Sequence, residues 1–144
     1  MKVRLALVAM SALLLSSCGT VSSSQAVRTW TKQSNFTSNT ATIVRDMRTS
    51  AAQLRDASSA APVLHTVCGV LLTDTEAANS SLPTPDQQAT KWLGLAYADI
   101  GAGANTCYNA ATSATLRARA LNYLRRGSAE LNFGVLRLGS AAAG

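Results

Sequence analysis

The chain has 144 residues, 13 Lys and Arg against 7 Asp and Glu, and a formal net charge of +6 at pH 7. This length suits a single domain with one hydrophobic core and excludes a large multidomain protein. The CxxCH, HExxH, GxSxG and phosphate-loop motifs are missing from the sequence, so none of their chemistries is indicated. The acidic residues are too scattered along the chain to predict a paired-carboxylate hydrolase.

A basic and then apolar leader opens the chain. Lys2 and Arg4 precede an apolar run at residues 5–15. The run has the length of a signal peptide and is shorter than the roughly 20 apolar residues that span a bilayer. It ends in Leu-Ser-Ser-Cys at residues 15–18, which resembles the lipobox of bacterial lipoproteins. The resemblance implies cleavage before Cys18, a diacylglycerol on its sulfur and acylation of the new amino group, for example with palmitate. An ordinary secretory signal with an incidental cysteine is the alternative.

The cysteine count fits this interpretation. If Cys18 carries lipid, Cys68 and Cys107 remain as a pair, and export places them in an oxidising compartment where a disulfide persists. Loss of Lys2 and Arg4 with the leader lowers the net charge to +4. We therefore expect a signal peptide at residues 1–17, a lipid-anchored tether at 18–26, a helical bundle domain at 27–139 and a disordered tail at 140–144.

Periodicity predicts four helices in chain order. Apolar residues recur at steps of three and four in residues 36–54, with an extension back to Val27, and again in residues 64–78. A third helix runs to Cys107 with Thr84 as its N-cap, and a fourth follows a cap at Thr112 or Ser113. Strand signals are nearly absent. The expected fold is all-α, an antiparallel four-helix bundle with one disulfide.

Gly94, Gly101 and Gly103 each disfavour a helix by roughly 1 kcal/mol relative to Ala. We interpret these three glycines of the third helix as positions where helices approach closely. A hinge is the functional alternative.

The disulfide constrains the connection between the second and third helices. A hairpin turning at Pro83 would place Cys68 about 22 Å and Cys107 about 36 Å from the turn, at 1.5 Å per helical residue. Such unequal lengths cannot give the Cα separation of about 4.4–6.8 Å that a disulfide needs. We therefore expect the second helix to stop near Asn79. Residues 80–84 should then continue as an extended arm that packs Leu82 near Trp92 or Ala89.

A set of residues spread over the mature chain forms a further pattern: Trp30, Asp46, Cys68, Asp74, the Leu-Pro-Thr-Pro-Asp run at 82–86, Trp92, Ala96, Tyr97 and Cys107. This pattern resembles that of small exported actinobacterial helical proteins of unassigned function. It implies a helical hairpin with a bridge between its cysteines, and no activity.

Two further patterns bear on ligands. Arg119, Arg126 and Arg137 fall near one angular line of the last helix, and form either a solvated face or a contact surface for anionic lipid, wall polymer or an acidic envelope partner. His65 could join Cys68 and Cys107 around zinc, but the third or fourth protein ligand of such sites is missing. We predict no metal and no cofactor.

These observations together predict a lipoprotein of the cell membrane, anchored through Cys18 on the extracytoplasmic side, with a structural or binding role and no catalysis. We do not expect nucleic acid as a partner of an exported chain. One alternative is a cofactor- or metal-dependent enzyme built in the bundle core. Another is a phage- or plasmid-encoded surface exclusion lipoprotein.

Overall fold

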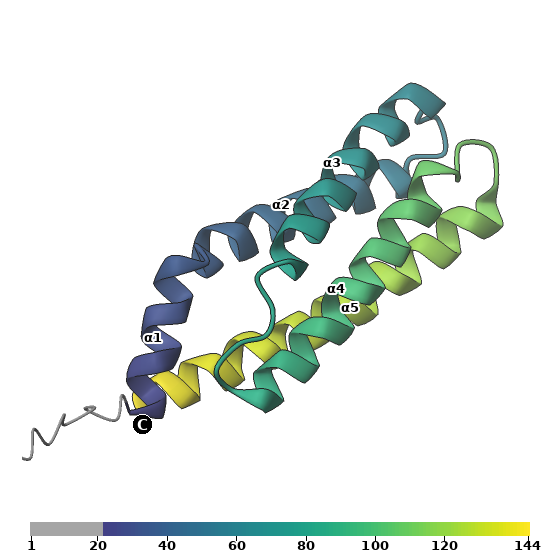
Figure 1. Ribbon diagram of the computed structural model, residues 1–144. Coiled ribbons are helices and arrows are strands. Elements are labelled where there is room, and N and C mark those ends of the chain that lie inside the picture. Colours follow the sequence, from purple (N-terminus) through teal and green to yellow (C-terminus); the bar gives the residue numbers. More distant parts are fainter. Residues whose placement is uncertain (1–21) are drawn as a thin grey trace, which may run out of the picture.

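The structure is a computed structural model that describes residues 22–144, and all regular elements in this range are α-helices. Five helices follow one another: α1 Ser23–Gln33, α2 Phe36–Arg55, α3 Ala61–Asn79, α4 Gln87–Tyr108 and α5 Ala114–Ala143 (Figure 1). The all-α prediction is confirmed, whereas the predicted number of four helices is wrong. The signal peptide predicted at residues 1–17 and the lipidated Cys18 lie outside the described residues.

The extra helix arises because the first predicted helix is divided at Asn35. This residue adopts a left-handed backbone with φ 50° and ψ 32°, a conformation that asparagine tolerates better than most residues. The Ser34 N–H still donates to the Trp30 carbonyl at 2.9 Å. Across the bend, the rings of Trp30 and Phe36 lie 5.4 Å apart. The chain therefore changes direction between α1 and α2 without leaving a long loop.

Both predicted ends of the domain need correction. The tether expected at residues 18–26 is already helical from Ser23, because the Ser22 side chain caps α1 by accepting from the Gln25 N–H at 3.2 Å. The tail expected to be disordered at residues 140–144 is helical through Ala143. Here Arg28 of α1 donates to the Ala142 carbonyl at 2.6 Å. The end of α5 thus lies beside α1 (Figure 1).

The connection between α3 and α4 follows the prediction in part: α3 stops where expected, but a turn replaces the extended chain predicted at residues 80 and 81. Helix α3 ends at Asn79, a turn occupies residues 80 and 81, and residues 82–84 have no regular structure. This arm descends beside α4, whereas the α2–α3 and α4–α5 connections lie together at the opposite end of the bundle (Figure 1). Leu82 packs over Gly94 of α4, where a Cβ would lie 3.9 Å from Leu82 Cδ1. The indole N–H of Trp30 donates to the Ser81 carbonyl at 3.1 Å.

The arm allows the disulfide to form. Cys68 of α3 and Cys107 of α4 are bonded, with their Cα atoms 5.9 Å apart, and both side chains are fully buried. The predicted disulfide is therefore confirmed. Closing a loop with a sequence separation of 39 residues stabilises the fold by about 4 kcal/mol in the chain-entropy model.

The N-cap predicted for the fourth helix is confirmed, whereas the N-cap of the third helix is a different residue from the one predicted. Ser113 caps α5 by accepting from the Leu116 N–H at 3.2 Å. Helix α4 is capped by Asp86, not by Thr84, and begins at Gln87. The Thr84 hydroxyl instead donates to the carbonyl of Asp86 at 2.6 Å.

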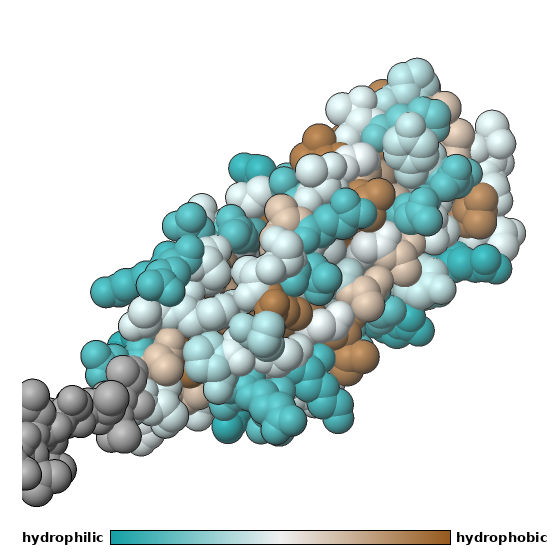
Figure 2. Space-filling view, in the orientation of Figure 1, coloured by the Kyte–Doolittle hydropathy of each residue, from teal (hydrophilic) through white to brown (hydrophobic). Residues whose placement is uncertain are grey.

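The predicted apolar stripes form one core. Its fully buried side chains include Ile43 of α2, Leu64 and Leu71 of α3, and Leu93 and Ile100 of α4. On the face shown in Figure 2, hydrophobic residues form separate patches among hydrophilic ones. None of the helices within residues 22–144 has the length and hydropathy to cross a membrane.

Close helix approach involves only one of the three predicted glycines. A Cβ on Gly103 would lie 2.8 Å from Leu124 Cδ2, whereas one on Gly94 or Gly101 would make ordinary contacts. Two further glycines at a close helix approach, Gly127 and Gly134 of α5, were not predicted from the sequence. A Cβ on Gly127 would lie 2.6 Å from Ile100 Cγ1 and 3.0 Å from the Ala96 carbonyl oxygen. Glycines on both helices thus bring α4 and α5 into direct backbone proximity.

Candidate binding groove

The arginines predicted to share one surface differ in their contacts. Arg126 pairs with Asp99 of α4 through two hydrogen bonds of 2.8 and 2.7 Å. Arg137 forms a bidentate ion pair with Asp86, and the shortest N–O distance in this pair is 2.7 Å. Arg119 is exposed, with no hydrogen bond or ion pair among the described residues. Two of the three therefore also hold α5 to α4.

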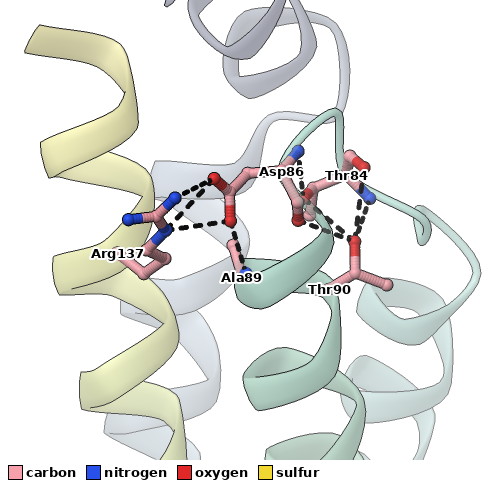
Figure 3. Close-up of polar contacts among 5 residues, drawn as sticks. All are labelled: Thr84, Asp86, Ala89, Thr90 and Arg137. Atoms are coloured by element: carbon pink, nitrogen blue, oxygen red, sulfur yellow. Dashed lines mark hydrogen bonds and ion pairs between the residues drawn. The ribbon is translucent and has the colours of Figure 1, made fainter. Parts of the chain in front are cut away.

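The Asp86 carboxylate joins a helix cap to an ion pair. It accepts from the Ala89 N–H at 2.7 Å and from Arg137, while Thr84 and Thr90 hydrogen-bond each other across the first turn of α4 (Figure 3). The hydrogen bonds from Arg137 lower the pKa of Asp86, and the Ala89 N–H acts in the same direction, while partial burial opposes both. This arrangement keeps Asp86 ionised and fixes the start of α4 against α5.

Arg117 at the start of α5 is a buried cation. Its side chain is 8% exposed. Its guanidinium donates to the carbonyls of Asp56 at 2.6 Å, Ser59 at 2.9 Å, Ala111 at 2.7 Å and Gln53 at 3.2 Å. It therefore ties the α2–α3 connection to the start of α5.

The spacing of α5 already contained a signal for Arg117. The buried residues of α5 alternate strictly in steps of three and four, and Arg117 is the first of them: Arg117, Ala120, Leu124, Gly127, Leu131, Gly134 and Leu138. An arginine in register with an apolar stripe indicates a buried guanidinium that needs carbonyl acceptors.

The residues considered for zinc have other partners. The sulfurs of Cys68 and Cys107 are consumed by the disulfide, and the His65 ring stacks on Tyr108 with ring centroids 4.2 Å apart. Within residues 22–144, no three or more His, Cys, Asp or Glu side chains are grouped so that they could hold a metal ion.

One pair of carboxylates is closer than the sequence suggested. Asp46 of α2 lies close enough to Asp74 of α3 to affect the titration of Asp74, and Asp46 is 8% exposed. Burial raises the pKa of Asp74, and the neighbouring Asp46 raises it further, while Arg45 acts in the opposite direction. Two of the acids that are scattered along the sequence are therefore brought together where α2 meets α3.

A groove runs between α2 and α5. One part has a volume of about 380 Å³ and includes Val44, Met47, Ala51, Leu121 and Leu124 in its wall. A second part shares Val44 with the first, has a volume of about 560 Å³, and continues past Leu131 to Val135. We call the two parts together the α2–α5 groove. Its floor is aliphatic, and it is open along one side.

The charge of the α2–α5 groove has one sign. Arg48 and Arg55 of α2 and Arg125 of α5 line it, and no acidic residue is among its described lining residues. Arg48 and Arg55 make no hydrogen bond or ion pair within residues 22–144, and Arg125 bonds only the Asn122 amide oxygen, at 3.3 Å. The Thr40 hydroxyl at one end is buried and has no hydrogen-bond partner in the part of the chain that the structure describes. Such a groove suits a ligand that is both apolar and anionic.

The comparisons with known proteins add no family. No protein-family model, curated protein or solved structure matches the chain. The functional interpretation therefore depends on the α2–α5 groove and on the leader pattern alone.

Proposed function

We propose that this protein is a lipoprotein of the cell envelope that binds an anionic amphipathic ligand in the α2–α5 groove. In this proposal lipid on Cys18 anchors the protein to the extracytoplasmic side of the membrane, as the leader pattern supports. The observation that carries the binding role is an aliphatic floor bordered by Arg48, Arg55 and Arg125 with no acid beside them. In the same proposal α1 and α2 together count as one bent helix, so that the fold is an antiparallel four-helix bundle.

Each part of the α2–α5 groove supports a separate feature of the ligand. The aliphatic floor favours an apolar group, because burying apolar surface yields roughly 25 cal/mol per Å². The guanidinium groups favour carboxylate or phosphate, since arginine matches both in geometry and charge. Asp46 and Asp74 are absent from the lining. The arginines of the groove therefore have no carboxylate beside them that could act as a general acid or base. This composition supports binding without catalysis.

Met47 offers a direct test of ligand binding. The sequence holds three methionines, Met1, Met10 and Met47, and only Met47 remains if the leader is removed. Octyl phosphate added to the methyl-labelled full chain in phosphatidylcholine nanodiscs should shift the Met47 methyl resonance in a saturable way. Inorganic phosphate and octanol, which lack the tail or the charge, should shift it far less.

Arginine variants make this measurement specific. Replacing Arg48, Arg55 and Arg125 with Gln should weaken the octyl phosphate response at least about tenfold, the equivalent of 1.4 kcal/mol. Arg119→Gln, which removes an exposed arginine outside the groove, should leave the response unchanged. An equal response in all three proteins would overturn the assignment of the groove.

The anchor has its own test. Wild-type protein made in a bacterial host with lipoprotein processing should partition into the detergent phase and incorporate labelled palmitate. Cys18→Ala should abolish both properties, because the thiol is the acceptor of the lipid. Unchanged palmitate labelling in Cys18→Ala would disprove the lipid site.

A further inference from the structure

The two walls of the α2–α5 groove share a repeat that a single aliphatic chain does not require. The α5 wall includes Leu121, Leu124, Ser128, Leu131 and Val135 in alternating steps of three and four, and the α2 wall includes Thr40, Val44, Met47 and Ala51 in the same steps. Among these residues Met47, Leu124 and Leu131 are buried, and the others are partly or fully exposed. This heptad spacing characterises helices that pack against a further helix. At 1.5 Å per residue the α5 wall is about 21 Å long and the α2 wall about 17 Å, which corresponds to a ligand helix of roughly three to four turns.

The arginines follow the same repeat. Arg48 and Arg55 are one heptad apart on α2, about 10 Å along the helix axis, and Arg125 lies on the opposite wall. Acidic side chains that recur every seven residues on a ligand helix would face both arginines of α2. The positive charge thus extends along the groove instead of converging at one end.

We infer that the α2–α5 groove receives an amphipathic helix of a partner protein, with its apolar face on the floor and glutamate or aspartate at heptad spacing against Arg48 and Arg55. This inference rests on the proposed binding function and specifies its ligand. Helix-in-groove recognition uses such apolar anchors together with flanking charges.

Charge and shape disfavour two other occupants. A second copy of this chain would bring its own Arg48, Arg55 and Arg125 against the same residues, and like charges placed together disfavour pairing. A lipid chain would stay exposed along the open side, whereas ligand pockets usually enclose most of a small ligand. An amphipathic helix can place its apolar face on the floor of the groove while its polar face stays hydrated, so the open side does not weaken its binding.

Designed peptides test the inference. The first peptide has about three heptads with Leu at the a and d positions and Glu at heptad spacing beside them. A second, of identical composition, carries the Glu residues on the opposite face. Both are titrated into the full chain in phosphatidylcholine nanodiscs, and the Met47 methyl resonance and peptide fluorescence anisotropy are recorded.

The first peptide should shift Met47 and bind at least about tenfold more tightly than the second. Replacing Arg48 and Arg55 with Gln should remove this preference, whereas Arg119→Gln should preserve it. Raised salt should weaken binding of the first peptide, because the arginines are exposed to solvent.

The contrary outcomes are distinct. If octyl phosphate shifts Met47 but neither peptide does, the groove binds a small amphiphile and the helix inference fails while the proposed function stands. If nanodiscs containing phosphatidylglycerol shift Met47 and block the peptide, the occupant is lipid. A Met47 shift that grows with protein concentration, with dimers in sedimentation, would identify a second copy. If neither octyl phosphate nor peptide binds, both proposals fail.

Discussion

Helix α5 contacts two of its neighbours, α4 and α2, in opposite ways. Against α4, Gly127 and Gly134 bring the backbones so close that a Cβ would lie 2.6 Å from an Ile100 or a Leu93 side-chain atom. Against α2, the same helix borders a groove edged by arginines. The difference shows that α4 and α5 form the rigid part of the bundle, while the position of α2 is set by other contacts.

Those other contacts come from three places. Arg117 of α5 holds the carbonyl groups at the end of α2. The Ser50 hydroxyl of α2 donates to the Val67 carbonyl of α3 at 3.3 Å, and Asp46 meets Asp74. Because α3 is bonded to α4 through the disulfide, α2 is fixed mainly through α3 and Arg117. The groove between α2 and α5 can therefore stay open without loss of the fold.

The largest expected effect is the loss of Arg117. Arg117→Met keeps the aliphatic stem but leaves the carbonyls of Asp56, Ser59 and Ala111 without their donor. We expect unfolding in urea to show a loss of about 3–5 kcal/mol, since several buried acceptors lose their partners. Arg117→Lys should recover only part of this, because a lysine cannot reproduce the fork of the guanidinium. A loss below about 1 kcal/mol for Arg117→Met would mean that α2 does not depend on this contact.

The second effect compares the two sides of α5 directly. Gly127→Leu places a side chain against the Ala96 carbonyl oxygen and Ile100, and should destabilise the protein by about 3 kcal/mol or more in urea unfolding. Ala51→Leu, which adds a side chain of the same kind in the open groove, should change the stability by less than about 0.5 kcal/mol. Equal costs at the two positions would show that both sides of α5 are packed alike.

The smallest expected effect is on the pH dependence of the stability, and it concerns the contact between α2 and α3. Burial, with Asp46 beside it, raises the pKa of Asp74 in the folded protein. The contribution of this group is therefore fully present below its unfolded pKa of about 3.9 and is lost as the pH rises through the folded pKa. Asp74→Asn should remove this loss, so the stability of the variant relative to wild type should increase with pH, by no more than about 1 kcal/mol.

Two features make the Asp74 measurement specific. Glu76→Gln, which removes a charge at an exposed position on the same helix, is the matched control. The contribution of Asp86 to stability depends on pH in the opposite direction, because Arg137 lowers the pKa of Asp86. This stabilisation is lost as the pH falls through the lowered pKa. A stability difference between Asp74→Asn and wild type that is flat with pH would show that the pKa of Asp74 is not raised in the folded protein.

The sequence by itself determined the features that depend on local spacing. Helical periodicity identified the stripes that now form the core, Ser113 was recognisable as a cap, and the unequal distances of Cys68 and Cys107 from Pro83 required the arm after Asn79. These predictions succeeded because helix pitch and disulfide reach are short-range constraints that hold in any fold. The lipobox is of the same local kind and remains a prediction.

The tertiary structure alone decided which helix faces meet. It divided the first helix at Asn35, moved the α4 cap to Asp86 where Arg137 could reach it, and brought Asp46 to Asp74 from different helices. It also separated Arg126 and Arg137, which pair with α4, from the arginines of the α2–α5 groove. Periodicity shows that a face is apolar or charged but not which neighbour it faces, and a groove exists only in the space that two helices leave between them.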